Sequence, residues 1–80
     1  MRPIEALNKI VEESEFSKAS LARALGKNNR YVASYSSSGI IPRVDTFARM
    51  IAPCGYDLIA RHRESGEEVI IDYDYDDPTE

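Results

Sequence analysis

The sequence predicts a mainly α-helical fold, with four helices followed by a C-terminal β-hairpin. Apolar residues recur at three- and four-residue spacing through residues 3–51, which is the spacing of amphipathic helices. From Tyr56 onward apolar and polar residues alternate instead, as they do in strands. Glycine and proline residues mark the ends of the predicted elements. Eighty residues provide for one small core, so we expect a single compact unit.

The first helix is predicted over residues 3–14. Pro3 suits its first position, because a helix leaves that backbone N–H without a partner in any case. Charged residues fall mostly on one side of this helix and apolar residues on the other. The apolar stripe, which we expect in the core, consists of Ile4, Leu7, Ile10 and Val11.

A second, short helix is predicted to begin after Ser17, whose hydroxyl can cap it. Ser20 stands where a capping box has Glu or Gln, so we expect that box to be incomplete. Gly26 can adopt the left-handed conformation that ends a helix. The expected buried stripe is Leu21, Ala22 and Leu25.

The third helix is predicted to begin at Asn28, with the asparagine side chain as its cap. About 100° of rotation per residue divides this helix into two faces. One face is apolar and carries Tyr31, Val32 and Tyr35. The other is polar and short-chained and lacks an acidic residue, unlike an ordinary solvated face; it carries Asn29, Arg30, Ala33, Ser34 and Ser37.

The segment Ser36–Gly39 is expected to lead into a loop that ends at Pro42. A fourth helix follows, and Pro53–Gly55 should end it with a distorted last turn. Its expected inward residues are Val44, Phe47, Ala48 and Ile51.

Residues 17–37 together predict a helix–turn–helix. Two helices joined by a tight glycine turn cross closely, which requires a small residue at the crossing. Ala22 meets that requirement, Gly26 permits the turn, and Val32 can fill the space between the helices. This spacing fits a DNA-binding motif and also fits a plain helical hairpin.

At these residues the chain resembles the phage repressor/Cro (Xre-type) helix-turn-helix family. Lys18–Gly26 is similar to the first motif helix and its turn, Asn28–Ser37 to the recognition helix, and Gly39–Phe47 to the following loop and helix. The resemblance covers about residues 16–58. It implies a sequence-specific double-stranded DNA-binding transcriptional regulator, acting as a repressor and as a homodimer on an inverted-repeat operator.

In such a motif the second helix enters the major groove and presents its N-terminal residues to base edges. The paired polar groups of Asn29 match adenine, and those of Arg30 match guanine. The expected base-contacting residues are Asn29, Arg30, Ala33, Ser34 and Ser37. The expected phosphate-contacting residues are Lys18, Lys27, Asn28 and Arg43, of which Lys18, Lys27 and Arg43 replace a frequent Gln, an apolar turn residue and a Ser cap of the family.

We divide the chain into a helical DNA-binding domain (1–55), a hairpin (56–75) and an acidic tail (76–80). Because Ile70 and Ile71 point to opposite sides of one strand, a single hairpin on a helical bundle can hide only one of them. Pairing of two copies through the hairpin would cover the other side. Packing on the helices of its own chain is the alternative. The expected dimer interface is Ile59, Val69, Ile70, Ile71 and Tyr73.

The charge of the chain is unevenly distributed. All ten Lys and Arg residues lie within residues 1–63 together with six acidic residues, a net charge of +4. Residues 64–80 hold eight acidic residues and no basic one, a net charge of −8. This asymmetry indicates a basic working surface. It leaves open two other roles for the acidic end: an antitoxin that binds a toxin protein, and an inhibitor that mimics DNA.

Other functions lack support in the residues. One cysteine and one histidine do not make a metal site, and we find no phosphate-binding glycine loop and no catalytic constellation. We therefore expect no enzyme activity, no metal and no cofactor. The N-terminus lacks a secretory signal and no apolar run spans a membrane, so we expect a cytoplasmic protein with no membrane partner.

Overall fold

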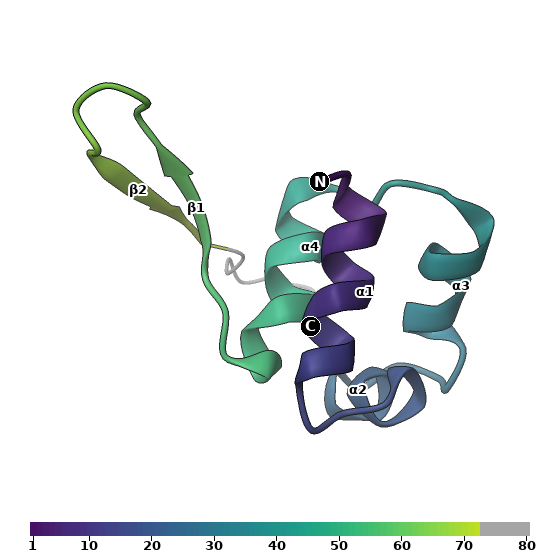
Figure 1. The fold of residues 1–80 in the computed structure, drawn as a ribbon. Helices are drawn as coiled ribbons and strands as arrows, with labels where there is room; N and C mark the ends of the chain where they lie inside the picture. The colour runs from purple at the N-terminus through teal and green to yellow at the C-terminus, as the bar shows by residue number, and fades with distance from the viewer. Residues whose placement is uncertain (73–80) are drawn as a thin grey trace, which may run out of the picture.

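The computed structural model describes residues 1–72, and its fold has the predicted class: four α-helices and then an antiparallel hairpin (Figure 1). Tyr73 and the acidic tail lie outside the described residues, as does the end of the predicted hairpin range. The elements are α1 (Pro3–Glu13), α2 (Lys18–Ala24), α3 (Tyr31–Ser38), α4 (Val44–Ile51), a 3₁₀ turn (Ala52–Cys54), β1 (Leu58–Arg61) and β2 (Glu68–Ile71).

The core lies where the four helices meet. α1 stands between α3 and α4, and α2 crosses below them (Figure 1). Each helix contributes at least one apolar side chain that is at most 4% exposed. Burial of such side chains supplies the main driving force for folding. The core cluster consists of Leu7, Val11, Leu21, Ala22, Val32, Met50 and Ile51.

The N-terminus of α2 is capped more completely than the sequence predicts. The Ser17 hydroxyl accepts the Ser20 backbone N–H at 3.0 Å, as expected of an N-cap. The prediction of an incomplete capping box is wrong, however, because the Ser20 hydroxyl accepts the Ser17 N–H at 2.9 Å. A serine at the third position thus takes the place of the longer Glu or Gln side chain.

The third helix begins later and ends later than predicted. α3 starts at Tyr31, so Asn29 and Arg30 lie in a turn that leads into it. Asn28 still caps this turn, since its side-chain oxygen accepts the Arg30 N–H at 2.8 Å. At the other end the helix continues to Ser38, one residue beyond the predicted Asn28–Ser37. Gly39 stops the helix with a φ of 78°, in the left-handed region that favours glycine.

In α4 the buried stripe differs from the predicted one. Val44, expected to point inward, is 59% exposed, whereas Met50 is 1% exposed. Val44 occupies the first position of α4 and therefore stands at the end of the bundle. Met50 follows Phe47 by three residues, about one helical turn, and its side chain belongs to the buried core cluster. The predicted distortion after α4 is confirmed, because Ala52–Cys54 form a 3₁₀ turn.

The hairpin projects away from the helices and touches them mainly at its base (Figure 1). Leu58 pairs with Ile71 at the base, followed by Ile59 with Ile70 and Ala60 with Val69. Residues directly opposite each other share a face, so the faces alternate along these pairs. The helices cover the described hairpin only at its base: Leu58 and Ile71 are half-buried, and the other apolar side chains of both strands are exposed.

Candidate nucleic-acid interface

The turn between α2 and α3 is tightly fixed. Gly26 has a φ of 77°, and the Lys27 N–H returns to the Ala22 carbonyl at 2.9 Å. This bond pattern ends α2 and reverses the chain within a few residues. Ala22 and Val32 are both fully buried where the two helices meet, as predicted. The two helices therefore pack together as a helix–turn–helix with a hydrogen-bonded turn.

The start of α3 presents a polar surface to solvent. Asn29 and Arg30 in the turn are exposed, as are Ser34 and Ser37 on the helix, and Ala33 is half-buried among them. The five predicted base-contacting residues thus lie in the turn before α3 or on α3 itself. We refer to Asn29, Arg30, Ala33, Ser34 and Ser37 as the reading face.

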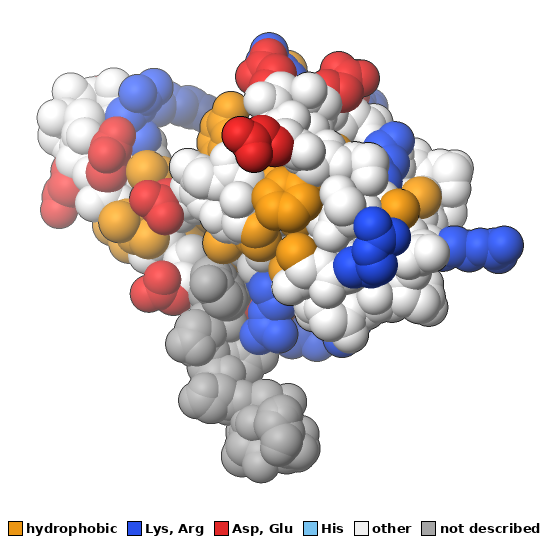
Figure 2. All heavy atoms as spheres, turned by 90° about the horizontal axis from the view of Figure 1, so that it is seen from below, with side chains coloured by type: hydrophobic (Ala, Val, Ile, Leu, Met, Phe, Trp, Pro, Cys, Tyr) orange, Lys and Arg blue, Asp and Glu red, His pale blue; other side chains and the backbone are white. Residues whose placement is uncertain are grey.

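The surroundings of the reading face are positively charged. The segment 16–44 contains five Lys or Arg residues and no acidic residue, a net charge of +5. In Figure 2 the right-hand side, where α3 lies, shows blue side chains and no red ones, while red side chains gather at the upper edge and over the hairpin. Within residues 1–72, the positive charge is therefore concentrated in the α2–α3 segment.

The serine hydroxyls of α3 are tied back to its own backbone. Ser34 donates to the Tyr31 carbonyl at 2.8 Å, and Ser37 donates to the Ala33 carbonyl at 3.0 Å. Both hydroxyl protons are donated to backbone carbonyls, but each hydroxyl oxygen keeps lone pairs that can accept a hydrogen bond. The reading face therefore offers acceptors from its serines and donors from Arg30.

The opposite side of α3 is anchored to the core. The Tyr31 and Tyr35 rings meet edge to face with centroids 5.6 Å apart. Ser36 donates to the Asn8 side-chain oxygen of α1 at 2.8 Å, across 28 residues of sequence. Burial, and next the adjacent Tyr35, raise the pKa of Tyr31 above its ordinary 10.0, so this phenol is neutral at physiological pH. These contacts fix the orientation of a serine-rich helix that has little intrinsic helix propensity.

The predicted phosphate contacts have different surroundings. Lys18 is the first residue of α2 and is half-buried. The Lys27 ammonium lies 5.4 Å from the centroid of the Tyr31 ring, a cation–π distance. The Asn28 side-chain oxygen is used in the turn, which leaves its NH₂ group as a donor. Lys27 and Asn28 are exposed next to the reading face.

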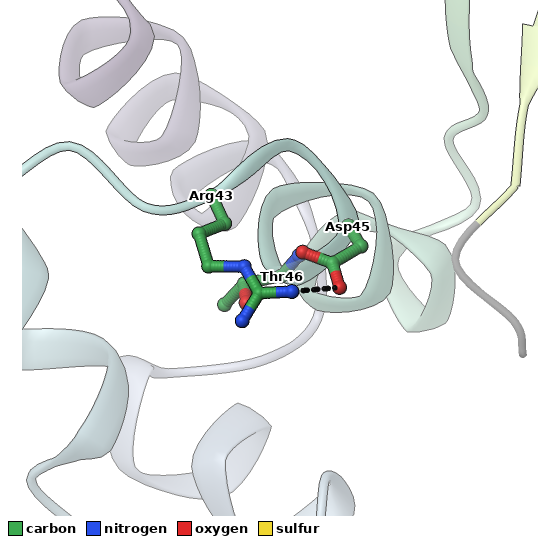
Figure 3. A network of polar contacts seen from close by, with 3 residues as sticks. All are labelled: Arg43, Asp45 and Thr46. Atoms are coloured by element: carbon green, nitrogen blue, oxygen red, sulfur yellow. Dashed lines mark hydrogen bonds and ion pairs between the residues drawn. The ribbon is translucent and has the colours of Figure 1, made fainter. Parts of the chain in front are cut away.

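Arg43 differs from these residues because it has an acidic neighbour. Its guanidinium contacts the Asp45 carboxylate at 3.0 Å, and Asp45 also accepts the Thr46 N–H at 2.9 Å (Figure 3). Arg43 provides no side-chain cap for α4. A phosphate must therefore compete with Asp45 for Arg43, which makes this residue a weaker candidate than Lys27.

Sequence reasoning missed Arg23. It lies in the last turn of α2, is exposed, and donates to the Asn29 side-chain oxygen at 3.4 Å. Its signal in the sequence is a cation on the outer face of α2, six residues before a predicted base-reading residue. A six-residue spacing across a turn does not by itself show that Arg23 contacts Asn29, because the contact depends on the geometry of the turn.

Two apolar surfaces are exposed away from the reading face. On the hairpin, Ile59 is 40%, Val69 58% and Ile70 57% exposed, and Ile71 is half-buried. A second surface is a shallow groove of about 280 Å³ beside the starts of α1 and α4. It is lined by Met1, Pro3, Ala6, Ile41, Pro42, Val44, Phe47 and Leu58.

No protein-family model, curated protein or solved structure matches this chain. Within residues 1–72, no three His, Cys, Asp or Glu side chains gather in a way that could hold a metal ion. The same part of the chain contains no helix that is both long and apolar enough to cross a membrane.

Proposed function

We propose that this protein is a transcriptional regulator that binds double-stranded DNA in a sequence-specific manner and acts as a repressor. One observation carries the proposal: a closely packed helix–turn–helix exposes an acid-free polar face at the start of its second helix. A helix of this kind fits the major groove, and the +5 charge of residues 16–44 favours the phosphate backbone. The same proposal places the protein in the cytoplasm, with its DNA.

On this proposal, base contacts and phosphate contacts come from different residues. Asn29 reads adenine and Arg30 reads guanine, because their side chains make bidentate contacts with those base edges. The Ala33 methyl group meets a thymine methyl group, and the hydroxyl oxygens of Ser34 and Ser37 accept from base amino groups. The phosphate contacts, which set position rather than sequence preference, are Lys18, Lys27, Asn28 and, more weakly, Arg43.

The active form is proposed to be a homodimer joined through the hairpin. The side chains of Ile59 and Ile70 are exposed on one face of the hairpin, and that of Val69 is exposed on the other face. A two-stranded hairpin with apolar residues exposed on both faces is marginal in water, and a second copy would cover it. Two copies related by a two-fold axis bind half-sites about 34 Å apart, which accounts for an inverted-repeat operator.

The proposal is tested by selecting bound duplexes from a random DNA library with the full chain. We expect a shared inverted repeat whose half-sites contain both an A·T and a G·C pair at fixed positions. The selected duplex should bind at least about 1,000-fold more tightly than random duplex at the same salt concentration. Recovery of duplexes with no shared sequence, bound with equal affinity, would refute sequence-specific recognition.

A further inference from the structure

Arg23 and Asn29 connect the two helices of the motif at their outer surface. The Arg23 Nη1 donates to Asn29 Oδ1 at 3.4 Å, from the last turn of α2 to the turn before α3. Two other cations contact carboxylates: Lys9 contacts Glu13 at 2.7 Å, and Arg43 contacts Asp45 at 3.0 Å. The partner of Arg23 is instead a neutral amide on the reading face. A guanidinium that contacts a base-reading amide can influence which base that amide reads.

The contact distinguishes the two ends of the Asn29 amide. Guanidinium groups only donate hydrogen bonds, so Arg23 pairs with the oxygen end and disfavours the NH₂ end. The backbone next to Asn29 is also held, because Asn28 Oδ1 accepts the Arg30 N–H at 2.8 Å. The oxygen of Asn29 therefore faces α2, and its NH₂ group faces away from Arg23.

This orientation remains compatible with adenine. A carboxamide oxygen has two lone pairs, so it can accept from Arg23 and from the adenine N6 amino group together, while the NH₂ group donates to adenine N7. The reversed amide would place two donors against each other at Arg23. Arg23 thus fixes the orientation of the Asn29 amide in the free protein. In that orientation the oxygen is placed to accept from adenine N6 and the NH₂ group to donate to N7.

We propose that Arg23 is a positioning residue that sets the adenine preference of Asn29 without touching the base. This inference rests on the proposed function and adds to it a residue that determines specificity at one A·T pair. Loss of Arg23 should therefore reduce discrimination at that pair, in addition to any loss of phosphate attraction. A residue that contacts phosphate alone reduces affinity equally for all sequences.

The test is a double-mutant cycle on the selected duplex and on the same duplex with the A·T pair replaced. Arg23→Ala, Asn29→Ala and their combination are compared by Kd at several salt concentrations. Lys27→Ala, alone and with Asn29→Ala, is the matched control, because Lys27 is an exposed cation next to the reading face that contacts Tyr31 instead of Asn29. Arg23 is exposed, so circular dichroism should show the helices intact in each variant.

We expect Arg23→Ala to lower discrimination at the A·T pair about fivefold, and to lower it no further in the Asn29→Ala background. Lys27→Ala should leave discrimination unchanged in both backgrounds. Arg23→Lys keeps a cation that only donates hydrogen bonds, so it should restore the salt dependence and part of the discrimination.

Unchanged discrimination in Arg23→Ala, or a loss of discrimination that is equally large in the Asn29→Ala background, would overturn the positioning role. These outcomes are separate from failure of the proposed function. That failure would appear as wild-type protein with no preference among duplexes, which would remove the positioning role as well. A wild-type preference that Asn29→Ala abolishes and Arg23→Ala leaves intact would refute the inference alone.

Discussion

The helical part and the hairpin differ in the burial of their apolar side chains. The four helices bury Leu7, Leu21 and Val32 completely within one chain, whereas the hairpin leaves Val69 and Ile70 more than half exposed. Helices of seven to eleven residues are marginal alone, so their stability comes from this shared core. In the described part of the hairpin, only Leu58 at the base packs against that core. The two regions therefore differ in how far one chain, over its described residues, buries its own apolar side chains.

The largest expected difference between the two regions is in stability. Leu21→Ala removes a fully buried side chain and should lower the free energy of unfolding by about 2–5 kcal/mol. The matched change Val69→Ala, on the exposed hairpin, should lower it by less than about 0.5 kcal/mol when the monomer is measured at low concentration. Urea unfolding followed by helical circular dichroism measures both. Equal losses would show that the hairpin belongs to the same core.

A second difference is in self-association. Ile70→Lys places a charge on an exposed apolar face and should weaken dimerisation about 100-fold while the helices stay folded. Ile71→Lys lies at the half-buried base of the hairpin and should also lower stability. Sedimentation and circular dichroism distinguish these two results. A wild-type protein that sediments as a monomer at high micromolar concentration would exclude the hairpin dimer.

The sequence predicted the elements of both regions but not the placement of the hairpin. Periodicity identified the core residues of α1 to α3, because helical spacing and burial follow the same geometry. It placed Val44 inward because periodicity does not show where a bundle ends. It could not predict the Ser20 half of the capping box, since a short hydroxyl reaches the backbone only in one geometry. Nor could alternation in the strands show whether helices cover either face.

The frame of the reading face also depends on local capping, with a smaller expected effect. Ser17→Ala removes the side chain that accepts the Ser20 N–H and should lower the free energy of unfolding by about 1 kcal/mol. Ser17→Asp keeps an acceptor at this position and should preserve stability. Thermal unfolding of the two variants measures the difference. An alanine variant as stable as the wild type would show that α2 does not depend on this cap.

The smallest expected effect is on the pH dependence of stability. Burial raises the pKa of Tyr31 above 10.0 in the folded state, so the unfolded chain loses this proton first. The contribution of Tyr31 to stability is therefore complete below pH about 10 and is lost as the pH rises through the folded pKa. Tyr31→Phe keeps the ring and should show a shallower loss of stability between pH about 9 and 11. The urea midpoints of the wild type and of Tyr31→Phe are compared across this pH range. An identical fall of the two midpoints with pH would contradict the prediction.

The central claim, that the start of α3 reads bases while nearby cations hold phosphates, is tested most directly by one pair of variants. The measurement is the Kd of Arg30→Ala and of Lys27→Ala for the selected duplex, a G·C-substituted duplex and random duplex, over a range of salt. We expect Arg30→Ala to cost about 1–3 kcal/mol on the selected duplex and to remove the preference at one G·C pair. Lys27→Ala should weaken binding to all duplexes alike and reduce the salt slope by about one. Uniform and equal losses in both variants would contradict the assignment of the reading face.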